Sequence, residues 1–352
     1  MIIVGGGLGG LLSAALFSKD ANVTLFERSR SVGGRFRNIQ REGFSLSTGA
    51  LHMLPHGSTG PVANILRMAG ANCDIVDSDP YGTFLHDGKE LRFHELRSSL
   101  PFHDKVKVAK MFLALRYLRV PDISLQEYLE QRFKDPIYLS VAKCIIGWST
   151  SITPSEIGMY DFSAIIRNIV RYGGPGIPIG GCGGVIKALM EVIKRNGVNI
   201  VHEGVSSILV EDGGVKGIET RDGEEHYDEC VVSDVGAKCT MELCPKASIP
   251  SDLRKRIDGM RPSGGVKINV SSDESLLNHN GVLFPLDCER VEGINEATKA
   301  DSTLAPEGKH LTMSHQTLQG RNVRSEIEKG ITDLEETFRG KDFRVICAQT
   351  YF

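Results

Sequence analysis

The sequence lacks the cysteine pairs that would hold a structural metal. Its eight cysteines are scattered over 352 residues, and no two have the C-x-x-C spacing of a zinc site or an iron–sulfur cluster. Dispersed cysteines are typical of reduced, mostly buried thiols in a cytoplasmic protein. His52 and His56 have Pro55 between them, and His310 and His315 fall on opposite faces of a predicted strand. We therefore expect no metal site.

Long apolar runs and an excess of one charge are also missing. No stretch of about 20 uncharged apolar residues occurs, so no segment is expected to span a membrane. The chain opens with an apolar segment and no basic region of the secretory type, which favours a cytoplasmic location. Forty-one Lys and Arg against 44 Asp and Glu leave a net charge of −3, which argues against nucleic acid as a partner. The sequence has no G-x-S-x-G motif of an acyl-transfer enzyme.

What remains is the composition of a globular protein, 41% hydrophobic and 24% charged. At about 150 residues per domain, the length predicts two domains. The first 27 residues carry the clearest pattern: an apolar run at 1–4, a glycine-rich turn at 5–10, helical spacing at 11–17 and a β-branched run at 22–26. This order predicts a strand–turn–helix–strand unit with a right-handed parallel crossover.

In the rest of the chain the sequence pattern changes twice. Residues 83–172 lack strand alternation and are punctuated by prolines, so we expect a mainly helical insertion with helices at 105–120 and 125–133. An α/β pattern returns at Gly180, with a helix predicted at 185–195 and strands at 199–202, 205–210, 215–220 and 229–233. Further strands are predicted at 266–270 and 343–349, with a helix between them at 323–337.

The turn after the first strand has the G-x-G-x-x-G spacing of a dinucleotide-binding loop. Gly5 permits the tight turn, Gly7 lets the backbone approach a pyrophosphate, and Gly10 allows close packing of helix on strand. Glu27 closes the second strand, where a carboxylate accepts hydrogen bonds from ribose hydroxyls. The alternative, a simple glycine turn with a surface glutamate, is weakened by this context.

A second glycine motif, Gly33-Gly34-Arg35, follows Glu27. Together the two motifs resemble the extended FAD fingerprint of the flavin amine oxidase superfamily, which includes amine and protoporphyrinogen oxidases, phytoene desaturases and carotenoid isomerases. The resemblance implies FAD as cofactor, with Arg35 offering a charge to the pyrophosphate or the flavin. It also implies an α/β fold, in which a Rossmann-like FAD-binding domain is interleaved with a mixed helical and sheet substrate domain. We expect the FAD-binding domain at 1–78 and 180–238 and the substrate domain at 79–179 and 239–352.

Weaker matches follow in the order that the family shows. The segment Gly49-Ala50-Leu51 resembles the one that lines the flavin ring, and Val205 resembles the strand valine whose backbone pairs with adenine; a glycine turn and a buried valine explain them equally well. The family normally ends in a further flavin-contacting segment, which we expect is missing after Phe352. The residues expected to bind the cofactor are Gly5, Gly7, Leu8, Gly9, Gly10, Glu27, Arg28, Gly34, Arg35, Gly49, Ala50, Leu51 and Val205.

No catalytic residue is assigned by these motifs, but Lys267 is a candidate. It lies in a strand-like run, and in amine and polyamine oxidases a lysine in a similar context reaches flavin N5 through a water. The simpler interpretation, which composition favours, is a surface lysine on an edge strand.

The helix predicted at 105–120 interleaves Lys107, Lys110, Arg116 and Arg119 with apolar residues. A basic amphipathic helix is able to lie on a membrane surface, so peripheral membrane contact is one interpretation. The cations spread around the helix, however, which favours an ordinary solvated helix of the domain.

The resemblance implies an oxidoreductase in which FAD takes a hydride from a small-molecule substrate. The desaturase and isomerase branch, with an apolar isoprenoid-like substrate, is our first expectation, and an amine or protoporphyrinogen oxidase is the alternative. A rival of another class is a prenyl-binding scaffold like the GDP dissociation inhibitors, which share the fold without using flavin. The intact glycine motifs and Arg35 favour the enzyme.

Overall fold

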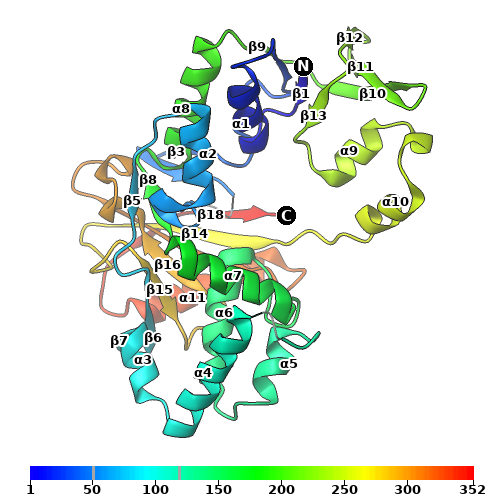
Figure 1. The fold of residues 1–352 in the computed structure, drawn as a ribbon. Helices are drawn as coiled ribbons and strands as arrows, with labels where there is room; N and C mark the ends of the chain where they lie inside the picture. Colours follow the sequence, from blue (N-terminus) through cyan, green and yellow to red (C-terminus); the bar gives the residue numbers. More distant parts are fainter. Residues whose placement is uncertain (50–51, 118–119) are drawn as a thin grey trace. The chain divides into compact units, whose positions relative to one another are not determined.

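The computed structural model describes residues 1–49, 52–117 and 120–352, and the chain divides into two compact units (Figure 1). Unit 1 comprises residues 1–38, 62–74 and 182–262, and unit 2 comprises residues 39–61, 75–181 and 263–352. The chain is therefore interleaved between the units. These bounds place 39–61, 75–78 and 180–181 in unit 2 and 239–262 in unit 1, whereas we expected each segment in the other domain.

Unit 1 is built on a parallel four-stranded sheet with the order β13-β1-β2-β9. Its strands are β1 (Ile2–Val4), β2 (Thr24–Phe26), β9 (Asn199–Val201) and β13 (Val231–Ser233). Ile3 pairs with Leu25 on one side and with Val232 on the other, and the side chains of Ile3 and Leu25 are fully buried. A buried parallel sheet explains the uninterrupted apolar runs in these short strands.

The other elements of unit 1 are helices and a small antiparallel sheet. The helices are α1 (Leu8–Phe17), α2 (Pro61–Ala69), α8 (Gly181–Arg195), α9 (Ala237–Leu243) and α10 (Ser251–Asp258), with a 3-10 turn η2 (Lys246–Ser248). The antiparallel sheet contains β10 (Val205–Glu211), β11 (Gly214–Thr220) and β12 (Glu225–Tyr227). The predicted helix 185–195 and the four strands from 199 to 233 are thus present.

Unit 2 is built on a seven-stranded mixed sheet with the order β18-β14-β17-β16-β15-β6-β7. The strands are β6 (Gly82–His86), β7 (Lys89–Arg92), β14 (Gly265–Ser272), β15 (Val282–Pro285), β16 (Gly293–Glu296), β17 (His310–Thr317) and β18 (Arg344–Tyr351). Helix α11 (Val323–Thr337) covers one face, because Val266, Ile268 and Val270 of β14 share a buried cluster with Leu334 of the helix.

The alternation of β14 leaves a polar row on its other face. Lys267 and Asn269 are both fully buried there, between β17 and β18. A strand buried on both faces with charged and amide groups on one of them is unusual, since buried polar groups are costly without partners. This face of the sheet is therefore a candidate functional site.

Between β7 and β14 lies the helical part of unit 2, with α3 (Phe93–Ser99), α4 (Phe102–Arg116), α5 (Leu125–Glu130), α6 (Ile137–Thr150) and α7 (Met159–Tyr172). Smaller strands and 3-10 turns complete the unit: β3 (Asn38–Arg41), β4 (Phe44–Ser47), η1 (Gly57–Thr59), β5 (Ile75–Asp77), β8 (Gly176–Pro178), η3 (Ala297–Lys299) and η4 (Ser302–Leu304).

The expectation of a mainly helical insertion over 83–172 missed one hairpin. β6 and β7 pair antiparallel through Asp87 and Gly88, both with positive φ, and β6 pairs in parallel with the distant β15. The Asp-Gly dipeptide is a hairpin signal that could have found this turn. The sequence of β6 does not show the apolar and polar alternation expected of a strand with one buried face, because Thr83 and Phe84 are adjacent and both buried.

Candidate functional site

The glycine-rich turn of unit 1 is built as a tight loop between β1 and α1. Gly5 has φ +100°, a conformation that favours glycine, and its N–H donates a 2.8 Å hydrogen bond to the carbonyl of Phe26. A β-carbon on Gly10 would overlap the carbonyl oxygen of Gly5, so the helix can approach the turn only with glycine at that position. Leu8 and Gly9, the first residues of α1, remain partly exposed at the helix N-terminus.

The second glycine motif lies directly against this loop. The N–H of Gly33 donates a 2.7 Å hydrogen bond to the carbonyl of Gly6, and a β-carbon on Gly34 would lie 3.3 Å from the α-carbon of Gly7. Gly33 and Gly34 have φ of +100° and +54°. Arg35 continues this turn and is exposed, as is Arg28 after β2. The structure thus brings the two motifs of the sequence together at one edge of the parallel sheet.

Glu27 follows β2 and reaches under the same loop. One carboxylate oxygen accepts the N–H of Gly6 at 2.7 Å, and the other accepts the N–H of Ser29 at 2.8 Å. A carboxylate has about four acceptor positions, so both oxygens can still accept bonds from hydroxyl groups. The half-buried side chain is therefore fixed by the backbone and keeps acceptor capacity for a ribose.

Asp234 is a functional candidate that the sequence reasoning missed. It follows β13, and its carboxylate accepts the N–H of Gly10 at 2.8 Å. A β-carbon on Gly7 or Gly9 would lie 2.6 or 2.5 Å from its oxygens. A carboxylate is stabilised at a helix N-terminus by the helix dipole. Because parallel strands end at one edge of the sheet, the predicted strand 229–233 could have placed this residue beside the loop.

These residues fit a dinucleotide. The strand ends carry a glycine-rich loop at the N-terminus of α1, a second glycine turn packed against it, and a fixed acceptor for ribose. Val205, predicted to contact adenine, begins β10, and its side chain is buried in a cluster with Ile2 and Phe26. Gly49 lies in unit 2 with φ +74°, and Ala50 and Leu51 lie outside the described residues.

The polar row of unit 2 begins at Lys267. Its side chain is fully buried, and its ammonium group donates a hydrogen bond to the carbonyl of Ser47. The interpretation as an edge-strand surface lysine is wrong, because β14 pairs with β17 on one side and β18 on the other. Its partners in register are His315 and Gln349, so these side chains share its face of the sheet.

His315 lies between Lys267 and a second buried ionisable group, the carboxyl group of Glu292. Its Nε2 is hydrogen-bonded to the hydroxyl of Tyr351, and Ser151 lies 3.0 Å from the same hydroxyl. Its Nδ1 is 3.9 Å from a carboxylate oxygen of Glu292, which accepts the N–H and hydroxyl of Thr317 at 2.7 and 2.8 Å. Only 1% of the His315 and Glu292 side chains is exposed.

Burial shifts both groups toward their neutral forms. It raises the pKa of Glu292 to about 7, against the opposing effect of the hydrogen bonds from Thr317. It lowers the pKa of His315 to about 3, and the neighbouring charges of His52 and Lys267 act in the same direction. Burial also raises the pKa of Tyr351. The cluster therefore contains a carboxyl group that can gain or lose a proton near neutral pH, beside a neutral imidazole.

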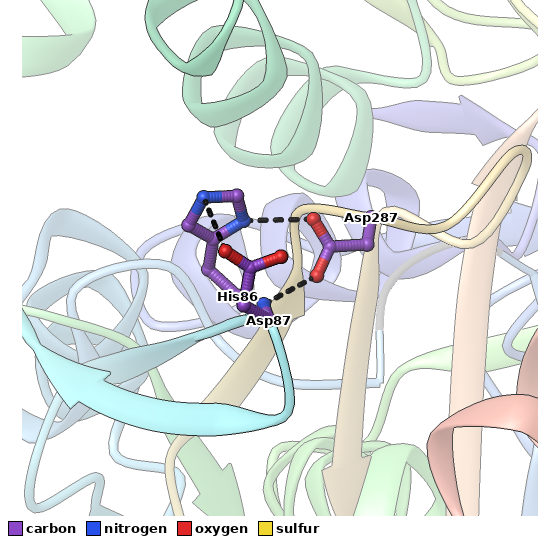
Figure 2. A group of neighbouring side chains, drawn as sticks. All are labelled: His86, Asp87 and Asp287. Carbon is purple, nitrogen blue, oxygen red and sulfur yellow. Dashed lines mark hydrogen bonds and ion pairs between the residues drawn. The ribbon is translucent and has the colours of Figure 1, made fainter.

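The histidines considered as metal ligands have other partners. His52 is hydrogen-bonded to Asn295, the Nδ1 of His56 lies 2.9 Å from the carbonyl of Gly173, and that of His310 lies 2.7 Å from Glu296. Among the described residues, one group has the spacing of metal ligands: His86, Asp87 and Asp287. It is partly exposed, and Asp287 accepts bonds at 2.7 and 2.8 Å from the ring of His86 and the N–H of Asp87 (Figure 2). These bonds tie the β6–β7 turn to the loop after β15, and no metal is inferred.

No helix in the described part of the chain is long and apolar enough to cross a bilayer.

Comparison with known proteins agrees with the architecture. Residues 3–69 match the family model of the NAD(P)-binding Rossmann-like domain. The structure matches the crystal structure of an oxidoreductase from Methanosarcina mazei with a TM-score of 0.94 and 39% identity, covering 99% of this chain and 87% of that one. Reduced UDP-galactopyranose mutase, 16% identical, shares the fold with a TM-score of 0.72 over 99% of this chain and 82% of its own. The fold and the glycine-lined edge thus define a two-unit protein with a dinucleotide-binding Rossmann-like domain.

Proteins related in sequence indicate more closely which class of protein this chain resembles. The chain is 41% identical to an uncharacterised protein of Methanocaldococcus jannaschii over 99% of its own length and 85% of the relative's. It is 24% identical to the prolycopene isomerase of Arabidopsis thaliana over 88% of its own length, and it spans 62% of that protein. A zeta-carotene-forming phytoene desaturase of Myxococcus xanthus is also 24% identical, over 88% of this chain and 70% of that enzyme. The chain belongs to one family with the Methanocaldococcus jannaschii protein and the Methanosarcina mazei oxidoreductase, and at lower identity it is similar to prolycopene isomerases and phytoene desaturases.

Proposed function

We propose that this protein holds FAD on the glycine-lined edge of unit 1 and uses it on an apolar, isoprenoid-like substrate. The observation that carries the proposal is the contact between the two glycine motifs above a fixed Glu27. A single G-x-G-x-x-G loop serves many dinucleotides, whereas a second glycine turn packed against the first extends the surface that accepts a pyrophosphate. Arg35 continues this turn and supplies an exposed cation beside it.

Each residue has a defined part in binding. The amides at the start of α1 bind the pyrophosphate, and Gly7 and Gly34 let the backbone approach it. Glu27 orients the ribose through hydrogen bonds to its hydroxyls. Bound FAD supplies a ring that accepts a hydride, and the protein binds, orients and excludes water.

The buried cluster of unit 2 is the candidate for proton handling. Glu292 holds a proton near neutral pH, and His315 lies between it and Lys267. Desaturation removes a hydride and a proton from neighbouring carbon atoms, so it requires a group that accepts the proton at a defined position. We therefore propose that Glu292 and His315 set the protonation state of the polar face on which Lys267 lies.

The substrate class is supported by the relatives. Prolycopene isomerases and phytoene desaturases are among the proteins that this chain resembles over most of its length. Because these relatives are enzymes, they also favour an enzyme over a prenyl-binding scaffold. Amine oxidation is the second candidate, and the burial of Lys267 on the sheet face favours it.

The first experiment is direct. The purified chain, heated or acidified, should release a yellow compound with the mass of FAD. Incubation with a cis-polyene, with phytoene and with a panel of small amines then separates the substrate classes, read as product by chromatography or as anaerobic bleaching of the flavin. A colourless protein that also fails to bind added FAD would overturn the proposal, and rapid bleaching by any amine would replace the apolar substrate with an amine.

A further inference from the structure

Helix α4 has two apolar faces, and the described residues cover only one of them. Leu115 is fully buried, and Val108 and Met111 pack against the same cluster. The second face is in solvent: Phe102 is 81% exposed, Leu113 58% and Tyr117, the residue after the helix, 62%. A helix that lies on a core in solvent normally turns polar residues outward, so this outer face is not explained by the fold of unit 2.

The exposed residues form a continuous stripe. At 3.6 residues per turn, Phe102, Val106, Leu113 and Tyr117 fall within about 60° of one another, opposite Leu115 and Met111. The stripe is about 22 Å long at 1.5 Å per residue. Its two ends are aromatic, and aromatic side chains favour the boundary between lipid and water. We call these four residues the outer stripe.

Cations border the outer stripe on both sides. Lys110 lies on one flank, and Lys105 and Arg116 lie on the other, with the Arg116 guanidinium 5.9 Å from the centre of the Tyr117 ring. In α4, every residue of which is described, Asp104 is the only acid; it is buried and forms a 3.1 Å ion pair with Lys107. The outward face of the helix therefore carries apolar groups and positive charge, and no acidic side chain.

We propose that α4 docks this protein onto the surface of an anionic phospholipid bilayer. The outer stripe enters the headgroup boundary, and Lys105, Lys110 and Arg116 contact the phosphates beside it. Long basic side chains suit these flanks because they lie along apolar surface while the charge reaches the phosphate. A second copy of the chain is a poorer fit, since two faces of this kind would bring like charges together. The inference rests on α4 alone and not on the cofactor.

Vesicle flotation tests the docking. Wild type should float with vesicles of phosphatidylcholine and phosphatidylglycerol, should remain unbound with phosphatidylcholine alone, and should be released by salt. Phe102→Ser with Leu113→Ser should weaken binding by about tenfold or more, from lost apolar burial. Lys110→Gln with Arg116→Gln should weaken it by about fivefold for each cation removed.

Matched controls use side chains of similar exposure elsewhere. Met68→Ser with Tyr227→Ser removes apolar groups that are 64% and 69% exposed, and Lys238→Gln with Arg324→Gln removes two exposed cations. Both controls should float like wild type, and unfolding curves should match for all variants because the changed side chains are on the surface. Wild type that does not float with anionic vesicles, or outer-stripe variants that float equally well, would overturn the proposal. So would a dimer that the Phe102→Ser, Leu113→Ser variant dissociates in the absence of lipid.

Discussion

The N–H of Gly33 donates a 2.7 Å hydrogen bond to the carbonyl of Gly6, which joins two glycine motifs that are separate in the sequence. The bond holds the second turn against the loop at the start of α1. It also leaves Glu27, which accepts the N–H of the same Gly6, fixed below both turns. The cofactor site is thus assembled mainly through backbone atoms, and substitutions at a few side chains should separate binding from folding.

Glu27→Ala should weaken FAD binding by roughly 10- to 100-fold or more, because charge-assisted hydrogen bonds contribute about 1.5–3 kcal/mol each. The protein should still fold, since the substitution removes only two hydrogen bonds to backbone N–H groups, one of them, at Ser29, in an exposed turn. Titration of apoprotein with FAD measures the effect, and Glu224→Ala, an exposed acid in the same unit, is the control. Unchanged affinity in Glu27→Ala would show that the ribose assignment is wrong.

Gly10→Ala should destabilise the protein by about 2–4 kcal/mol, because the new methyl group would overlap the backbone carbonyl of Gly5. Gly9→Ala is the matched control, one residue away in the same helix. Its β-carbon would meet the carboxylate of Asp234, a side chain that can shift at the cost of its hydrogen bond from Gly10, so stability should fall by less than in Gly10→Ala. Urea unfolding of both variants compares them, and equal stabilities would contradict the packing argument.

Glu292→Gln should stabilise the protein at alkaline pH and leave it unchanged in acid. The carboxyl has a pKa of about 7 in the native state and an ordinary value of 4.5, so the folded protein holds this proton more tightly than the unfolded chain. The Glu292 carboxyl therefore has no effect on the free energy of unfolding in acid, and it lowers that free energy as the pH rises from 4.5 through 7. At about pH 8 the variant should gain about 3 kcal/mol over wild type.

Unfolding measured at about pH 4 and about pH 8 tests this difference. His315 acts in the opposite sense, because a depressed pKa favours the folded state at higher pH, but it is present in both proteins. Glu335→Gln, an exposed acid on α11, should show no pH-dependent gain. An equal effect of Glu292→Gln at both pH values would mean that the carboxyl does not titrate as proposed.

Lys267→Met should have little effect on flavin reduction if the substrate is apolar. Amines should then fail to bleach the flavin even in wild type, as anaerobic stopped-flow mixing would show. If the protein oxidises amines instead, the same substitution should slow reduction by amines or reoxidation by oxygen while FAD stays bound. Lys299→Met, an exposed lysine in the same unit, is the control for the loss of a charge.

Elements whose sequence signals are local could be predicted before the structure. Glycine spacing, a four-residue apolar run and the position of Glu27 were enough for the loop between β1 and α1, and helical periodicity matched α11 over 323–337. These features depend on neighbours along the chain, so composition and period report them directly.

Contacts between segments that are distant in the sequence could be found only in the folded protein. Lys267 is buried because β17 and β18 pair on both sides of β14, and no property of its own segment distinguishes this from an edge strand. Asp234 reaches the glycine loop because β13 lies beside β1, more than 200 residues away in sequence. The raised pKa of Glu292 and the exposure of one face of α4 both depend on which other segments pack against them. Burial is a property of the assembled fold, and local sequence does not specify it.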